Sequence, residues 1–256
     1  MRLETSNFRL HTLRFAADAL LSVILAPACA ACGELLEHPT RGPVCSACWR
    51  SILPLTPPLC DRCGDPLPTW RAISRPLAVC ARCRRARPIV TRARAIGSHD
   101  GALRAIVHAL KYEGRRSLAR PLATLMRQRG ADVLADATCV VPVPLHASRR
   151  RQRGFNQASD LARCLHLPVV PALRRTRPTA TQTGLPAAQR HRNVRDAFTV
   201  SRAGRRLSHM PAAIVVLVDD VSTTGATLEA CARALKDAGV EEVRALTAAR
   251  VVTPPR

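Results

Sequence analysis

The chain has 256 residues, with 40 lysines and arginines against 18 aspartates and glutamates, 11 cysteines and an aromatic content of only 3%. This length allows one large domain or one medium and one small domain, and a hydrophobic content of 47% is too high for a disordered chain. The sequence contains no run of about 18 uninterrupted apolar residues, which excludes a membrane-spanning helix. We therefore expect a soluble protein.

The net charge of +22 comes almost entirely from arginine, since lysine occurs only at Lys111 and Lys236. Such a preference can reflect coding bias as well as function. Arginine keeps its charge at any pH and binds phosphate with two donors, so polyanionic ligands fit this composition.

The N-terminal segment has two readings. Basic residues precede the apolar stretch 19–26, as they do in a secretion signal. Asp18 interrupts the apolar character, however, and Leu20 and Ile24 fall at helical spacing. We interpret residues 1–28 as an amphipathic helix and expect a cytoplasmic location.

Eight of the 11 cysteines form four C-x-x-C pairs. The pairs are Cys29 with Cys32, Cys45 with Cys48, Cys60 with Cys63, and Cys80 with Cys83. This spacing lets one turn of backbone present two sulfurs to a tetrahedral ion, so it predicts two zinc sites of four thiolates each. Disulfides or redox-active pairs are the alternatives. An odd cysteine total and four pairs in tandem fit these alternatives poorly.

An internal repeat indicates which pairs share a metal. Residues 29–33 match residues 60–64, each with glycine after the second cysteine, and residues 44–48 match residues 79–83. We therefore predict a double zinc ribbon over 29–88, although interleaved pairing stays open. One ion would be held by Cys29, Cys32, Cys45 and Cys48, and the other by Cys60, Cys63, Cys80 and Cys83. Complete thiolate coordination leaves no position for water, which makes both sites structural.

Beyond residue 89, strand-type and helix-type segments alternate. We predict strands at 92–99, 138–143, 213–218 and 242–252, helices at 101–112, 116–129, 156–165 and 225–238, and a polar loop at 178–193. This alternation is typical of a mainly parallel sheet flanked by helices, here a domain over 89–256.

The most informative stretch is 215–227. Four aliphatic residues predict a buried strand, Asp219 and Asp220 follow at its tip, and hydroxyl residues with Gly225 then open a helix whose amides can bind phosphate. An ordinary threonine cap would explain the hydroxyls. It would not explain two adjacent carboxylates, whose repulsion calls for a cation or hydroxyl partner.

This stretch resembles the phosphoribosyl pyrophosphate (PRPP) motif of type I phosphoribosyltransferases. The resemblance implies that the catalytic pair Asp219 and Asp220 holds the ribose 2′ and 3′ hydroxyls, and that the following loop holds the 5′-phosphate. The PRPP-binding residues of this loop would be Val221, Ser222, Thr223, Thr224, Gly225, Ala226 and Thr227.

Three further segments, 108–114, 141–157 and 174–198, resemble the ComF family of competence-associated phosphoribosyltransferase-like proteins. The resemblance rests on the motifs His108-Ala-Leu-Lys-Tyr-Glu-Gly114, Val141-Pro-Val-Pro-Leu-His146 with Arg153-Gly-Phe-Asn-Gln157, and the stretch Arg174 to Phe198. The family has an N-terminal double zinc ribbon, so the likeness covers nearly the whole chain. It implies a type I phosphoribosyltransferase-like fold over 89–256. It also implies that the stretch from Arg174 to Asn193 forms a flexible hood over the reaction centre, which includes Thr181, Gln182, Arg190 and Asn193.

The segment after the second predicted strand also has a chemical rationale. Pro144 and Leu145 form a rigid turn that precedes Arg149 and Arg153, a suitable cradle for pyrophosphate accompanied by Mg²⁺. A solvated basic helix face is the alternative for each arginine.

Two functions fit these features. One is a phosphoribosyltransferase that transfers phosphoribose from Mg²⁺-bound PRPP to a nitrogen acceptor. The other is a non-catalytic PRPP sensor that handles single-stranded DNA, with competence-machinery proteins as partners. Because the chain has only 2 Trp, 1 Tyr and 4 Phe residues, DNA contact would be salt-dependent and made to the backbone. The acceptor is not encoded in any recognisable motif.

Overall fold

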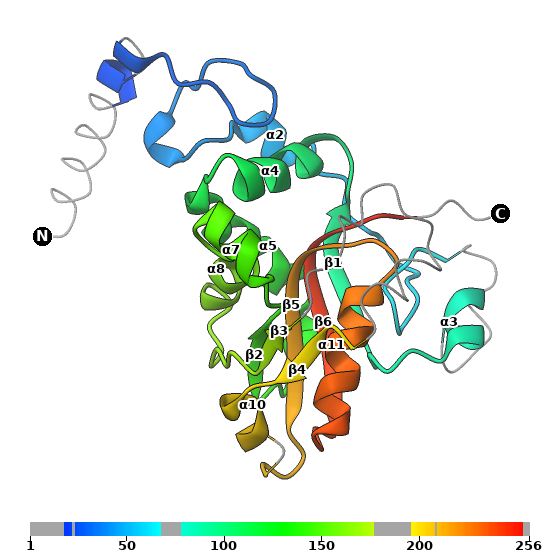
Figure 1. Ribbon diagram of the computed structural model, residues 1–256. Coiled ribbons are helices and arrows are strands. Elements are labelled where there is room, and N and C mark those ends of the chain that lie inside the picture. The colour runs from blue at the N-terminus through cyan, green and yellow to red at the C-terminus, as the bar shows by residue number, and fades with distance from the viewer. Residues whose placement is uncertain (1–17, 22–23, 68–77, 177–195, 208, 253–256) are drawn as a thin grey trace, which may run out of the picture. The chain divides into compact units, whose positions relative to one another are not determined.

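The computed structural model describes residues 18–21, 24–67, 78–176, 196–207 and 209–252 (Figure 1). The chain divides into two compact units, one of Met1–Ile52 with Asp100–Leu118, the other of Leu53–His99 with Ala119–Arg256. Most of the predicted N-terminal helix lies outside the described residues. Among the helices in the described ranges, none has the length and apolar character needed to cross a membrane.

The larger unit is built on a four-stranded parallel sheet in the order β1-β6-β5-β2. Its strands are β1 (Ala93–Ser98), β2 (Cys139–Pro142), β5 (Ile214–Ser222) and β6 (Glu242–Arg250). All four lie where the alternating pattern predicts strands, and the predicted parallel sheet is confirmed.

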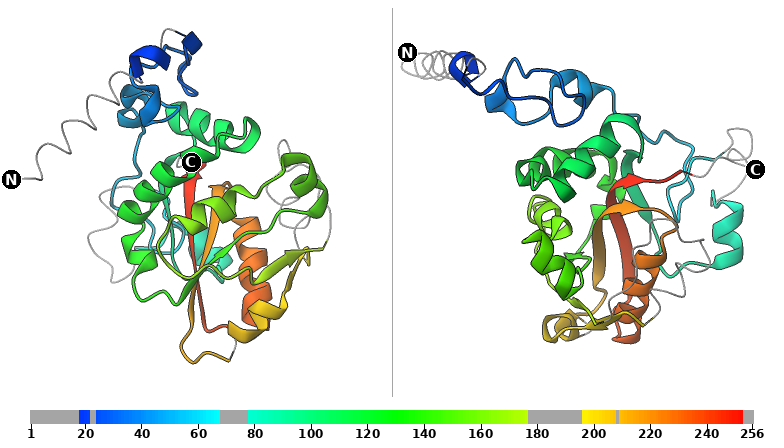
Figure 2. Two further views of the ribbon diagram at one scale, coloured as in Figure 1. Left: turned by 90° about the vertical axis from the view of Figure 1, so that its left-hand side faces the viewer. Right: turned by 45° about the horizontal axis from the view of Figure 1, so that its top comes forward.

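Helices cover both faces of this sheet (Figures 1 and 2). The helices α5 (Ala119–Arg129) and α8 (Gln157–Arg163) pack on one face, and α11 (Ala226–Asp237) packs on the other. The four apolar residues of β5, Val215 to Val218, are therefore 0% exposed. A strand buried on both faces loses the polar alternation of a half-exposed strand, which explains its continuous aliphatic run.

Several short elements of this unit were not predicted. They are α6 (Ala131–Leu134), α7 (Ala147–Arg153), α10 (Arg202–Leu207), and the antiparallel pair β3 (Leu173–Arg175) and β4 (Phe198–Val200). Strands of three residues are too short to display a period, and α7 has no buried residue and so no apolar stripe.

The smaller unit contains the first cysteine-rich segment. Its elements are η1 (Pro39–Arg41), α2 (Ser46–Arg50), α4 (Gly101–Tyr112) and η3 (Arg116–Leu118). Helix α4 has the predicted bounds, and its start is capped by Asp100, whose carboxylate accepts a 2.8 Å hydrogen bond from Gly101 N–H. Its buried face includes Leu103, Ile106 and Leu110, and α2 packs against it.

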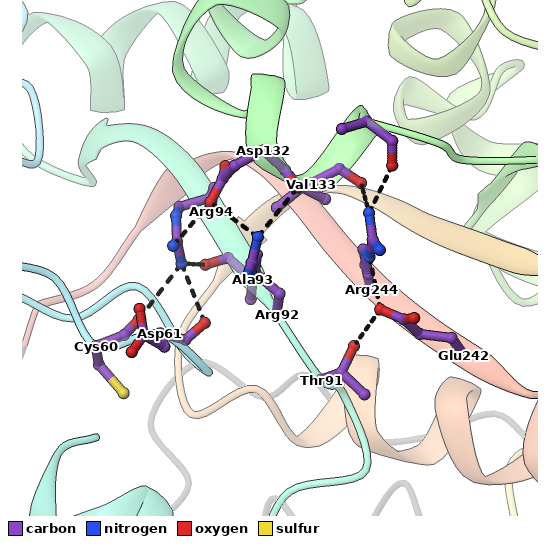
Figure 3. Close-up of polar contacts among 11 residues, drawn as sticks. Cys60, Asp61, Thr91, Arg92, Ala93, Arg94, Asp132, Val133, Glu242 and Arg244 are labelled. Carbon is purple, nitrogen blue, oxygen red and sulfur yellow. Dashed lines mark hydrogen bonds and ion pairs between the residues drawn. The ribbon is translucent and has the colours of Figure 1, made fainter. Parts of the chain in front are cut away.

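The second cysteine-rich segment, with α3 (Ala81–Ala86), belongs to the same unit as the sheet. Arg94 of β1 contacts this segment directly (Figure 3). Arg94 Nη1 donates to the carbonyls of Cys60 and Asp61 at 3.4 and 3.3 Å, while Nη2 lies 2.8 Å from the Asp132 carboxylate. The approach is close, because a Cβ added at Gly64 would lie 2.7 Å from the Ala93 carbonyl oxygen.

This close approach distinguishes two glycines that occupy equivalent positions in the repeat. Gly33 and Gly64 have φ angles of +79° and +73°, so alanine strains the backbone at either position. Only at Gly64 does a methyl group also clash, since nothing lies within 4 Å of a Cβ at Gly33.

We expect Gly64→Ala to destabilise its zinc ribbon by about 1–3 kcal/mol more than Gly33→Ala does. Metal release to a chromogenic chelator, followed separately for each variant, would measure the difference. Equal release rates for the two variants would contradict the packing assigned to Gly64.

Candidate functional site

The eight paired cysteines form two groups of four, in each of which all sulfurs lie within 4.8 Å of one another. The first group is Cys29, Cys32, Cys45 and Cys48, and the second is Cys60, Cys63, Cys80 and Cys83. This is the pairing that the repeat predicts, and it excludes interleaved pairs. All 11 cysteines lie in the described ranges, and none is in a disulfide.

The sulfur geometry fits zinc. A tetrahedral ion with Zn–S bonds of about 2.3 Å requires sulfur-to-sulfur distances of about 3.8 Å. The Cys29–Cys48 and Cys32–Cys45 sulfur pairs are both 3.9 Å apart, and the Cys63–Cys80 pair is 3.7 Å apart. Disulfide formation would need sulfurs about 2 Å apart.

The same backbone turn builds both sites. Cys29 N–H donates a 2.7 Å hydrogen bond to the backbone carbonyl of Glu34, and Cys60 N–H donates the equivalent 2.8 Å bond to the backbone carbonyl of Asp65. A backbone N–H also donates to the first sulfur of each group, from Cys45 to Cys29 and from Cys80 to Cys60, at 3.3 Å in both cases. These bonds stabilise the thiolate form that a zinc ligand requires.

The stabilisation of the thiolate by backbone hydrogen bonds is evident at Cys29, whose pKa is lowered. Burial raises the pKa of this thiol, but hydrogen bonds from the backbone of Cys45, Cys32 and Ala31 outweigh burial and lower the pKa to about 6. These hydrogen bonds therefore favour the thiolate form that binds zinc.

We expect the purified protein to contain two zinc ions per chain, one for each cluster of four cysteines. Cys32→Ser and Cys63→Ser should each reduce the content by one ion, because three thiolates hold zinc much less tightly than four. Elemental analysis after dialysis against a weak chelator measures this. Zinc-free wild-type protein that is still fully folded would contradict the assignment.

The predicted PRPP motif lies at the carboxyl end of β5. This strand continues to Ser222 instead of ending at residue 218, so Asp219 and Asp220 are strand residues rather than a tip beyond it. Their register with β6 is continuous, with Asp219 opposite Thr247 and Val221 opposite Ala249. Successive strand residues point to opposite faces, so the two carboxylates do not share one face. The electrostatic repulsion between the two carboxylates is therefore smaller than their adjacency in the sequence suggests.

The two aspartates also differ in burial. Asp220 is only 3% exposed and accepts a 2.6 Å hydrogen bond from Val221 N–H. Asp219 is half-buried and accepts from Asp220 N–H at 2.9 Å. Asp219 is thus the more accessible carboxylate.

The loop from Ser222 to Gly225 connects β5 to α11. Gly225 adopts φ +82°, a left-handed conformation that glycine tolerates best, and Thr224 Oγ1 accepts a 3.3 Å bond from Ala226 N–H at the start of α11. The first turn of α11 is fixed by Glu229, whose carboxylate accepts from Ile89 N–H at 2.8 Å. The loop therefore lies at the positive end of a well-anchored helix, which favours anions.

An arginine that the sequence did not single out lies beside this motif. Arg175, at the end of β3, stacks over Phe198 with its guanidinium carbon 5.4 Å from the ring centroid. Burial, followed by the positive charge of Arg149, lowers the pKa of Arg175, whereas the negative charge of Asp219 acts to raise it. Arg149, Arg175 and Asp219 are therefore close enough to interact. Nothing in the local sequence distinguishes Arg175 from the other arginines, because it acts through tertiary proximity.

The predicted cradle after β2 is adjacent to β5. Val143 N–H donates to Val218 at 2.9 Å, which brings the exit of β2, with Pro144 and Leu145, beside the strand that carries the aspartates. Arg149 is half-buried, whereas Arg153 Nη1 donates to the buried Gln157 side chain at 2.7 Å and so links α7 to α8.

His146, at the end of the segment Val141–His146, has a structural role. Its Nδ1 accepts a 3.3 Å hydrogen bond from Ser148 N–H and caps the start of α7.

The predicted hood residues Thr181, Gln182, Arg190 and Asn193 lie outside the described residues. The flanks of that segment are defined, since Thr176 N–H donates to the Ala197 carbonyl at 2.9 Å and β3 pairs with β4. Arg174 and Arg175, expected within the hood stretch, belong instead to β3.

Comparison with known proteins defines the class. A model of the double zinc ribbon domain matches residues 20–84, and a model of the phosphoribosyl transferase domain matches residues 151–253. Two solved structures resemble the chain at 20% identity, an allosteric regulatory enzyme of purine biosynthesis (TM-score 0.35, 55% of this chain and 30% of that one) and the orotate phosphoribosyltransferase of Aeropyrum pernix (TM-score 0.31, 57% and 76%). By the two family models, the protein combines a phosphoribosyltransferase-type domain with a double zinc ribbon.

Relatives specify the family. Competence protein F of Haemophilus influenzae is 30% identical over 223 residues, which cover 83% of this chain and 93% of that protein. The DNA utilization protein YhgH of Salmonella typhimurium is 33% identical, covering 78% and 87%, and competence protein ComFC of Bacillus subtilis is 26% identical, covering 77% and 79%. The chain belongs to the ComF family of competence-associated phosphoribosyltransferase-like proteins.

Proposed function

We propose that this protein binds PRPP with magnesium at the carboxyl edge of β5 and β2 and transfers its phosphoribose to a nitrogen acceptor in the context of DNA uptake. One observation carries the proposal: the half-buried Asp219 carboxylate lies at the loop that opens α11, and Arg149 and Asp219 both lie within electrostatic range of Arg175. Open parallel sheets bind ligands at this edge.

The roles of the individual groups follow from their chemistry. Carboxylates are acceptors for ribose hydroxyls, so Asp219, the more exposed of the two aspartates, would hold the sugar. Asp220 is 3% exposed and points to the opposite face of the sheet, so it would not contact the same ribose in this arrangement. The loop from Val221 to Thr227 would bind the 5′-phosphate through its amides and hydroxyls. Arg149 and Arg175 would face the diphosphate, since a guanidinium forms paired hydrogen bonds with phosphate oxygens.

Magnesium would enter this site with PRPP. Carboxylate oxygens such as those of Asp219 are the hard ligands that Mg²⁺ prefers, so the residues fit the ion. When bound, it would neutralise charge on the diphosphate.

In the transfer, the bond between ribose C1 and the diphosphate oxygen breaks, and the acceptor nitrogen forms a new bond to C1. The diphosphate leaves with the bonding electron pair, and the acceptor loses a proton. The protein would act by fixing the ribose and stabilising the departing negative charge, which is mainly electrostatic catalysis.

We expect Asp219→Asn to weaken PRPP binding by about 10- to 100-fold, the value of a hydrogen bond to a charged group. Titration calorimetry with Mg²⁺ and PRPP measures the affinity. The matched control is Asp237→Asn, which makes the same substitution at an exposed position of α11. Because PRPP is an anion, simple charge repulsion predicts the opposite, a modest gain in affinity for both variants. That result would refute the sugar-binding role of Asp219.

The transferase activity itself is tested by PRPP-dependent release of pyrophosphate in a screen of nucleobases and amines. We expect release that depends on an acceptor and is lost when Arg175 is replaced by Met, because the leaving group loses a counter-charge. Binding of PRPP without release for any acceptor would contradict catalysis.

A PRPP-sensing protein that binds single-stranded DNA is the second candidate. The net charge of +22 and the run of arginines in α7 favour contact with a phosphate backbone. This candidate requires DNA affinity that falls steeply with salt and changes when PRPP is added. The transferase candidate requires neither.

A further inference from the structure

Arg250 is a buried arginine at the carboxyl end of β6, and no step of the proposed function uses it. It is only 4% exposed, and β6 lies between β1 and β5 in the sheet. Its strand register places it opposite Ser98 of β1 and Ser222 of β5. A guanidinium is rarely buried unless it has partners that compensate for the loss of water.

Two contacts supply part of this compensation, while Nη2 of Arg250 is buried without a hydrogen-bond partner among the described residues. Nε of Arg250 donates to the Asp65 carboxylate, and Nη1 donates to Ser222 Oγ at 3.3 Å. Asp65 belongs to the turn of the second zinc ribbon, where its carbonyl accepts from Cys60 N–H at 2.8 Å. Ser222 is the last residue of β5 and begins the connection Ser222–Gly225 that precedes α11. The arginine therefore connects a zinc-binding turn to the proposed phosphate-binding loop.

The charges around the second zinc site explain why arginines gather there. A zinc ion with four thiolates carries a net charge of about −2. Arg82 donates to the other oxygen of Asp65 at 2.8 Å. Burial lowers the pKa of Arg82, but Asp65 and the thiolates of Cys63 and Cys80 more than offset it. Arg250 in turn lies within electrostatic range of Cys63, so both arginines are close to the charge of the cluster.

The first ribbon provides an internal comparison. In the repeat, Glu34 occupies the position of Asp65, and Ala47 occupies the position of Arg82. An alanine cannot provide the counter-charge, so this network is specific to the second ribbon. Arg94 adds to the specificity, because it is 12% exposed and donates to the carbonyls of Cys60 and Asp61 (Figure 3).

We propose that Arg250 is a positioning residue through which the second zinc ribbon holds the loop Ser222–Gly225 in its phosphate-binding conformation. The inference rests on the proposed PRPP site for its functional consequence. Its structural content, the dependence of this loop on Asp65, can be tested whether or not PRPP is the ligand.

The test compares the full-length wild type with Asp65→Asn, with the double variant Asp65→Asn and Arg250→Gln, and with Glu34→Gln as the matched control in the first ribbon. Hydrogen exchange of residues 222–227, PRPP affinity, zinc content and thermal stability are measured for each. The double variant is needed because Asp65→Asn alone leaves a buried charge without its counter-ion and can unfold the unit.

In the double variant we expect zinc content close to that of wild type and stability above that of Asp65→Asn. We also expect exchange on the order of tenfold faster in residues 222–227 and PRPP affinity on the order of tenfold lower. If the pair of Arg250 and Asp65 served stability alone, hydrogen exchange of residues 222–227 and PRPP affinity would return to their wild-type values in the double variant as its stability recovers. Glu34→Gln should leave hydrogen exchange of residues 222–227 and PRPP affinity unchanged.

Wild-type exchange of residues 222–227 in the folded double variant would overturn the inference, as would an equal effect of Glu34→Gln. Failure of the proposed function gives a different result. If the wild type does not bind PRPP, the PRPP site is refuted, while the exchange comparison still decides whether Arg250 positions the loop.

Discussion

The parallel pairing of β5 with both β2 and β6 is the constraint on which the candidate site depends. Because Val215 to Val218 are completely buried between helices on both faces, the strand cannot shift by one residue without placing a polar group in the core. The register therefore determines that Asp219 and the loop before α11 emerge at the carboxyl edge. Val143 and the segment that follows β2 emerge beside them.

Two zinc ribbons of nearly identical local geometry have different surroundings. Each uses the same turn, with a glycine at positive φ and a backbone N–H donated to its first sulfur. The first belongs to the unit that contains α4, whereas the second packs directly on the sheet through Arg94 and Arg250. A metal site that replaces a hydrophobic core can thus also support a neighbouring loop, because its net charge attracts arginines that make further contacts.

The candidate site was predictable in part. The aspartates, the hydroxyl-rich loop and the apolar strand before it are contiguous in sequence, so a site for an anion beside a cation or hydroxyl group could be proposed from the local pattern, and the family resemblance supplied the individual roles. The orientation of the two carboxylates could not be predicted in this way, because it depends on how far β5 continues. The length of β5 is in turn set by its pairing with β6. The short pair β3 and β4 was missed because three residues carry no detectable period, and with it the position of Arg175.

The sequence by itself determined whatever depends on neighbours along the chain. This includes the four cysteine pairs and their grouping by repeat, the buried strands, helix α4, and the ComF resemblance. Only the tertiary structure decided which distant groups meet. Asp65, Ser222 and Arg250 are far apart in sequence, and one arginine among many becomes distinctive only when folding buries it between two specific partners. The physical reason is that desolvation and charge pairing depend on three-dimensional distance, which local patterns do not encode.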